Sequence, residues 1–243
     1  MRPEFADMIY VAKMDEGLLP GKGNRRLVFI GDVHGCYDDL VALLAELQHD
    51  ARTDHIIFTG NMIAKGSASP SVIDLAISVN ASCVRGNHED RVLLTYRDLS
   101  EHRVPITNKL PPPSPGKPEE AAAFREDAVE GSLNEEFFSR TEIDDRKLAK
   151  QFTREQIDFM AKCPVILDVG KVKKLGMVRV VHGGLIPGIK LERQDPMSVM
   201  QMRTVDLGTH VPSDSSKGTA WFKVRFHLLK PPPLRHAVLN NRF

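Results

Sequence analysis

Two side chains with metal-binding chemistry stand close together near the start of the chain. Asp32 and His34 follow an apolar run and are flanked by Gly31 and Gly35. Because side chains alternate along a strand, both can turn toward one point, and the glycines allow the backbone to approach it. A carboxylate and an imidazole that converge in this way suit a divalent ion such as Zn, Mn or Fe. Alone, an Asp-x-His pair also fits an ordinary loop, so further motifs have to support the hypothesis.

A second candidate group lies in the segment RGNHED, residues 85–90. Asn87 can offer a neutral amide oxygen to a metal, and His88 can act as a general acid toward a leaving oxygen. The alternative is a helix start, with Asn87 as the N-cap and His88 exposed. His182 ends the apolar run VRVVH before two glycines and is a further candidate imidazole ligand, although a histidine at a strand end is usually structural.

Strands, tight loops and helices alternate through the first hundred residues and must position these side chains. Residues 26–31 are β-branched and aromatic, which predicts a strand, and residues 36–48 carry leucines at helical spacing. The pattern then predicts, in order, a strand at 55–59, a helix at 71–79, a strand at 82–85 and a helix at 89–99. Such alternation indicates parallel βαβ units that bind ligands at the carboxyl ends of their strands, where the candidate residues lie.

The remainder of the chain is less regular. Residues 104–145 are rich in proline and then in acid, which predicts a flexible or partly helical insertion. Thr153 is a candidate N-cap for a helix that reaches Cys163, and strands are expected at 165–168 and 178–182.

The last part of the chain carries weaker structural signals. Beyond Asp206 no clear periodicity remains, and residues 215–243 contain six Lys and Arg but no acid. This basic tail fits either a polyanion-binding arm or a truncated or misassembled end, and the second alternative is favoured because acid-free, aperiodic sequence rarely packs.

Composition excludes some classes of function. The chain has 33 basic and 32 acidic residues, so it lacks the overall positive field that attracts nucleic acid or anionic membranes. Residues 1–24 hold no apolar run long enough for a signal peptide or a membrane span, which favours a cytoplasmic location. The cysteines, Cys36, Cys83 and Cys163, are odd in number and widely spaced, which favours reduced thiols. Cys36 is expected to be a small buried residue.

In order and spacing, the motifs GDVHG (31–35), TGNMIAKG (59–66), RGNHED (85–90) and the strand-end His182 resemble the calcineurin-like metallophosphoesterase superfamily. The segments MIAKG, ASCVRGNHEDRVLL and VVHGGLIPG look most like fungal proteins related to the zinc-dependent endopolyphosphatase and, more distantly, like diadenosine tetraphosphatase and serine/threonine phosphatases. The resemblance implies an α/β fold, a two-sheet sandwich with flanking helices. It would place this domain at residues 25–206, after an N-terminal extension at 1–24 and before an atypical tail at 207–243.

The resemblance also implies a mechanism and a set of roles. Two divalent ions would hold a hydroxide that attacks phosphorus in line, in a phosphate-containing small molecule or polyphosphate. Asp32 and His34 would bind the first ion, position 61 would bridge, Asn87 and His182 would bind the second, and His88 would protonate the leaving group. Candidates to neutralise the phosphoryl oxygens are Arg85, Arg91 and Lys65, each of which equally fits a plain surface or helix-face role.

The chain departs from the family pattern at the bridging position and at its end. Asn61 stands where the pattern has aspartate, and it offers one neutral oxygen beside two dications. The loss of a negative charge there is expected to weaken or remove one of the two ions. The closing Gly-His pair of the pattern is not found, which predicts a fold incomplete at its C-terminus. We therefore expect either a weakened hydrolase of phosphate esters and anhydrides or an impaired protein that only binds phosphate or polyphosphate.

Overall fold

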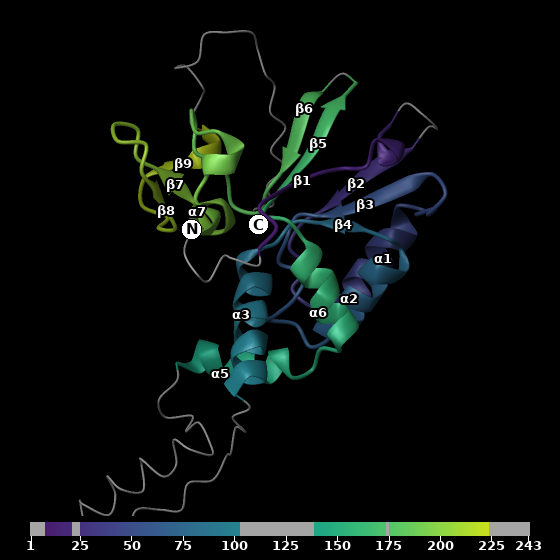
Figure 1. The fold of residues 1–243 in the computed structure, drawn as a ribbon. Coiled ribbons are helices and arrows are strands. Elements are labelled where there is room, and N and C mark those ends of the chain that lie inside the picture. The colour runs from purple at the N-terminus through teal and green to yellow at the C-terminus, as the bar shows by residue number, and fades with distance from the viewer. Residues whose placement is uncertain (1–7, 21–24, 103–138, 174, 224–243) are drawn as a thin grey trace, which may run out of the picture. The chain divides into compact units, whose positions relative to one another are not determined.

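The computed structural model describes residues 8–20, 25–102, 139–173 and 175–223 (Figure 1). The chain divides into two compact units. The first unit runs to Asp90 and resumes at Thr153, and the second runs from Arg91 to Phe152. The candidate residues other than Arg91 belong to the first unit.

A parallel sheet forms the centre of the first unit. Its strands are β2 (Arg26–Ile30), β3 (Asp54–Phe58) and β4 (Ser82–Cys83), in the order β2-β3-β4. Ile30 pairs with Phe58, which in turn pairs with Cys83, so the three strands end at one edge. The connecting helices are α1 (Tyr37–Glu46) and α2 (Ser69–Ser78), and the predicted βαβ alternation is confirmed.

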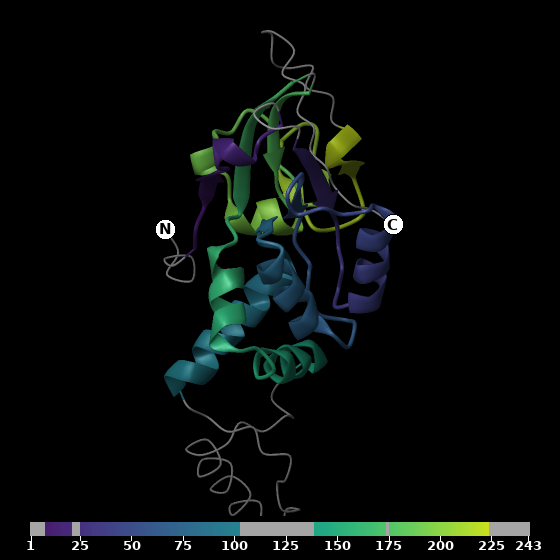
Figure 2. The same ribbon diagram turned by 90° about the vertical axis from the view of Figure 1, so that its right-hand side faces the viewer.

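A second sheet packs on the first one. It contains β1 (Val11–Lys13), β5 (Ile166–Val172) and β6 (Gly176–Val180), with β1 parallel and β6 antiparallel to β5. Buried residues of both sheets share one apolar cluster: Met14, Ile57, Val84, Leu167, Val169, Val172, Val178 and Val180. Figures 1 and 2 show the β5–β6 hairpin on one side of the parallel sheet, with α1 and α2 on the other. The α/β two-sheet sandwich expected from the resemblance is thus confirmed.

A small third sheet follows the sandwich. Helix α7 (Pro196–Gln201) leads into β7 (Thr204–Val205), which pairs with both β8 (Pro212–Ser213) and β9 (Thr219–Ala220). Part of the segment predicted as an unpacked tail is therefore ordered around a buried cluster that includes Trp221. Strands of two residues are too short to leave a periodic pattern in the sequence.

Two further helices show capping boxes. Helix α6 (Arg154–Lys162) begins after Thr153, whose hydroxyl accepts from the backbone N–H of Gln156, so the predicted N-cap is confirmed. The Gln156 amide also donates to the Asp74 carboxylate on α2 over 2.6 Å. In the second unit, α5 (Arg140–Ala149) has its own capping box, and its Asp145 accepts from Arg91.

Helix α3 (Asn87–His102) and three short 3-10 helices complete the described elements: η2 (Glu16–Leu18), η4 (Leu191–Arg193) and η5 (Trp221–Lys223). Within the described ranges, none of the helices is both long and apolar enough to cross a membrane. Residues 104–138 of the predicted insertion lie outside the described residues.

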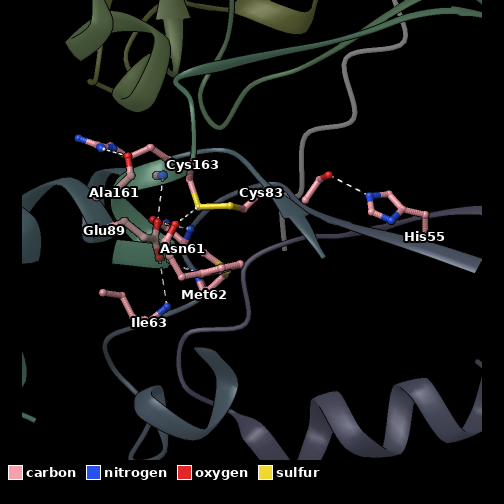
Figure 3. The surroundings of a disulfide bond; sticks show 12 residues. His55, Asn61, Met62, Ile63, Cys83, Glu89, Ala161 and Cys163 are labelled. Carbon is pink, nitrogen blue, oxygen red and sulfur yellow. Dashed lines mark hydrogen bonds between the residues drawn. A yellow bond between two sulfur atoms is a disulfide. The ribbon is translucent and has the colours of Figure 1, made fainter. Parts of the chain in front are cut away.

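The cysteines correct two expectations. Cys83 at the end of β4 and Cys163 after α6 form a disulfide bond, with Cα atoms 5.1 Å apart (Figure 3). The expectation of reduced thiols is therefore wrong for this pair, because the fold brings together residues 80 positions apart. Cys36 is exposed rather than buried, since it stands in the loop just before α1.

Candidate metal centre

The loops that follow β2, β3 and β4 meet at the carboxyl edge of the parallel sheet. The backbone N–H groups of Val33 and His34 donate to the Asn61 carbonyl over 3.0 and 2.9 Å, and Gly66 donates to the His34 carbonyl over 2.7 Å. These bonds fix the first two loops to each other. The loop after β3 is held in the left-handed region at Asn61 (φ 54°), Ala64 (φ 70°) and Lys65 (φ 64°), a strained backbone of the kind found at functional sites.

The first predicted ligand pair, Asp32 and His34, is in contact. An Asp32 carboxylate oxygen lies 3.3 Å from Nε2 of His34, while Nδ1 of the same ring lies 3.1 Å from the Ile63 carbonyl. Since a carbonyl only accepts, Nδ1 donates, and the lone pair of the neutral ring is then on Nε2. The Lys65 ammonium lies 2.8 Å from that Nε2 and donates to it.

The second predicted pair, Asn87 and His182, is also formed. His182 donates from Nδ1 to the Thr59 carbonyl over 2.9 Å, which leaves its Nε2 as an acceptor 3.2 Å from the Asn87 carbonyl oxygen. This distance between a ring nitrogen and an amide oxygen matches the separation of neighbouring ligands on one cation, about 3.0–3.4 Å for bonds of about 2.0–2.1 Å. His182 Nδ1 lies 3.9 Å from an Asp32 oxygen, so the two pairs adjoin.

Asn61 stands between these pairs with its amide in a hydrogen-bonded orientation. Its NH2 donates to Asp32 over 3.2 Å, and its carbonyl oxygen accepts from the His88 backbone N–H over 3.3 Å. The Asp32 and His34 lone pairs therefore face N–H donors, from Asn61 and Lys65, rather than a vacant ligand position.

The donor set consequently fits one divalent ion better than two. In the described part of the chain, no three His, Cys, Asp or Glu side chains are grouped closely enough to hold a metal. The Asn87–His182 pair is preorganised as two neutral ligands beside the single carboxylate of Asp32. A second ion at Asp32 and His34 would have to displace two hydrogen bonds and gains no charge from Asn61.

His88 and Lys65 extend the site. The His88 ring meets the His34 ring edge to face, with centroids 5.0 Å apart, and is partly exposed, as an acid that serves a substrate must be. Lys65 is exposed. The structure thus brings seven of the predicted residues together: Asp32, His34, Asn61, Lys65, Asn87, His88 and His182.

The two arginines are placed differently from the other candidates. Arg85 is buried, with 6% of its surface exposed, and its guanidinium donates to the Ala161 carbonyl over 2.9 Å and contacts Asp90 at 3.4 Å. Burial lowers the pKa of Arg85, an effect that the Asp90 charge opposes. Arg91 lies in the second unit, where its guanidinium contacts both oxygens of Asp145, at 2.9 and 3.3 Å.

Glu89, Gly60 and Gly86 also shape the site, although none of them was predicted to do so. Glu89 is fully buried and accepts backbone N–H groups from two site loops. A Cβ atom on Gly60 would lie 2.9 Å from His182 Nδ1, and one on Gly86 would lie 2.6 Å from the Asn61 side-chain oxygen. The signal was present in the sequence, since Glu89 follows His88 directly within RGNHED.

An α/β sandwich with metal-ligand pairs at the carboxyl edge of its parallel sheet is the architecture of metal-dependent phosphoesterases. The family model of calcineurin-like phosphoesterases matches residues 25–238, and the chain belongs to this family. Its members use divalent metals.

Individual relatives cover only part of the chain. The symmetrical bis(5'-nucleosyl)-tetraphosphatase of Klebsiella pneumoniae is 41% identical over 76 residues, which is 30% of this chain and 27% of that protein. The enzyme of the same name from Sodalis glossinidius is 38% identical over an equal length. The chain therefore spans about a quarter of the length of the curated relatives it matches. A crystal structure of a protein assigned as a diadenosine tetraphosphatase superposes with a TM-score of 0.60 at 20% identity, covering 88% of this chain and 73% of that one, and supports the fold.

Proposed function

We propose that this chain hydrolyses phosphoanhydride bonds with the help of one divalent ion, in a nucleotide-like or polyphosphate substrate. The observation that carries the proposal is the approach of His182 Nε2 to the Asn87 side-chain oxygen over 3.2 Å, with an Asp32 oxygen 3.9 Å from Nδ1 of the same ring. The relatives named as tetraphosphatases support an anhydride substrate. Polyphosphate stays a candidate because MIAKG and VVHGGLIPG resemble the endopolyphosphatase group, and a cytoplasmic site of action stays a prediction.

Each residue has a distinct task in this proposal. Asn87, His182 and Asp32 would hold the ion, and a bound divalent ion supplies Lewis-acid polarisation of a phosphoryl oxygen. Lys65 would neutralise phosphoryl charge, at the position where its ammonium now donates to His34. His88 would donate a proton to the leaving phosphate oxygen, a step that typically contributes roughly 10²–10⁴ in rate.

One observation favours a second candidate function. The Asn61 amide donates to Asp32 and adds no negative charge, so the centre attracts cations less strongly than a pair of carboxylates would. With Lys65 adjacent, the same cluster suits a protein that binds phosphate or polyphosphate without turning it over.

Cleavage of diadenosine tetraphosphate to nucleotides and of polyphosphate to shorter chains or phosphate, measured with Mn²⁺ or Zn²⁺, separates the candidates. The hydrolase proposal expects turnover that His88→Asn lowers by about 10²-fold or more, while His210→Asn, in the turn between β7 and β8, leaves it unchanged. Absence of both metal and turnover from the unmodified chain and from Asn61→Asp would refute the hydrolase. Calorimetry in the presence of a chelator tests the binder, and no heat of polyphosphate binding there would exclude it.

A further inference from the structure

A single buried carboxylate joins two of the loops that carry the site. Glu89 has 0% of its surface exposed, and one oxygen accepts from the backbone N–H groups of Met62 and Ile63 over 2.8 and 3.3 Å. The other oxygen accepts from Asn61 and Gly86, both over 2.9 Å. Figure 3 shows Glu89 beside the backbone of residues 61–63. Four donors from two loops therefore converge on one side chain.

The four bonds explain how a carboxylate can be buried at this place. Burial of an unpaired carboxylate is costly, whereas one with both oxygens hydrogen-bonded keeps much of the stabilisation it had in water. Both Glu89 oxygens act only as acceptors, which is the role of an ionised group. Glu89 also lies in the first turn of α3, where the helix dipole favours negative charge.

The two loops approach each other closely at Gly86, next to the Glu89 carboxylate. A Cβ atom added to Gly86 would lie 2.6 Å from the Asn61 backbone nitrogen and 2.7 Å from a Glu89 oxygen. The loop after β4 therefore touches the loop after β3 with no room for a side chain. Asn61 lies in the first of these loops and Asn87 begins α3 directly after the second, so the contact lies between them in space.

We infer that Glu89 is a positioning residue that sets the distance between Asn61 on one loop and the Asn87–His88 segment on the other. It acts without touching a metal or a substrate, because both of its oxygens are occupied by backbone N–H groups. The predicted effect of Glu89 on metal affinity rests on the proposed function, whereas its predicted effect on loop geometry does not.

The test compares Glu89→Gln with Asp90→Asn, which makes the same change in the adjacent buried carboxylate. Asp90 contacts the Arg85 guanidinium at 3.4 Å. In metal-free protein, Glu89→Gln is expected to speed hydrogen exchange by roughly ten- to a hundredfold at the two amides that lose their acceptor. The NMR signals of the His34 and His88 rings should shift as well, since their edge-to-face contact spans a loop junction. Asp90→Asn should change neither.

A second measurement follows the consequence for the site. Mn²⁺ affinity in an Asn61→Asp background is expected to fall about 10- to 100-fold with Glu89→Gln, as for other residues that orient metal ligands. Glu89→Asp, which keeps the charge but is too short to reach both loops, should show the same loss and covers the case in which Glu89→Gln does not fold.

The outcomes separate this inference from the proposed function. Unchanged exchange and ring signals in both Glu89 variants, or altered signals with unchanged Mn²⁺ affinity, would overturn the positioning role. If Mn²⁺ binds to no variant, the proposed function fails, and the positioning role is then decided by the exchange and ring signals alone.

Discussion

Replacement of Asn61 by aspartate exchanges the amide that faces Asp32 for a second carboxylate. The backbone tolerates the change, because Asp adopts left-handed conformations such as the φ of 54° at this residue almost as readily as Asn. Two unit charges 3.2 Å apart repel by about 5 kcal/mol at an effective dielectric of 20 and by about 1 kcal/mol in bulk water. The Asp32 side chain is 32% exposed, so screening places the repulsion between these limits, at about 2–3 kcal/mol.

The metal-free Asn61→Asp protein should therefore be less stable than the unmodified chain, and a divalent ion should reverse the loss. Ion at 100 times its dissociation constant contributes about 2.7 kcal/mol of stability, which nearly cancels the repulsion. Urea denaturation with chelator and then with excess Mn²⁺ measures both effects, and elemental analysis gives the metal content per chain. Asn80→Asp is the matched control, since Asn80 has a φ of 50° and is exposed. Equal stability of Asn61→Asp and the unmodified chain in chelator, with no gain on addition of metal, would refute the reasoning.

Three other perturbations test the fold around the centre. Serine at both Cys83 and Cys163 should lower the free energy of unfolding by about 4 kcal/mol, because their bond closes a loop of 80 residues; urea midpoints equal to those of the oxidised protein would contradict this. Burial lowers the pKa of His55 below its ordinary 6.5. As the pH is lowered through 6.5, the unfolded state therefore takes up a proton before the folded state does, and the free energy of unfolding decreases as the pH decreases. His55→Gln should flatten that slope in denaturation measured from pH 7 to 5, and an unchanged slope would count against it. Thr153→Ala should cost about 1 kcal/mol by loss of the α6 cap, and a melting temperature equal to that of the unmodified chain would argue against the cap.

Short sequence patterns predicted the strands and helices whose formation depends on residues close together in the sequence. The run that becomes β3 is fully buried along its length, and Thr153 precedes Gln156 at the spacing of a capping box. Strand β1 was missed because it has three residues and pairs with β5, more than 150 positions further on. The leucine spacing over residues 36–48 predicted α1 correctly.

In the candidate site, too, some residues were predictable from sequence patterns, whereas contacts between residues far apart in the sequence were not. Asp32, His34 and Asn87 were predictable because they follow strands of the parallel sheet, whose ends meet at one edge, whereas His182 follows β6 of the second sheet and was predicted only from its place at a strand end before two glycines. The partner of Arg85 was not predictable, because the Ala161 carbonyl that accepts from it is 76 residues away in the sequence. The disulfide has the same origin, since Cys83 and Cys163 flank a contact between β4 and the end of α6 that no short pattern records.

Asn61 contributes to the scaffold and to the charge of the site through different atoms. Its backbone N–H donates to Glu89 and its carbonyl accepts from the loop after β2, and Asn or Asp can supply both at the left-handed φ of this position. Its side chain alone decides the charge next to Asp32. Asparagine in place of aspartate at position 61 therefore leaves the packing around Glu89, Gly60 and Gly86 unchanged, but it removes one negative charge from the ligands of the site. The motif glycines and Glu89 consequently fix the shape of the centre, whereas the side chain of residue 61 sets the charge beside Asp32, and we expect that charge to govern how many ions bind.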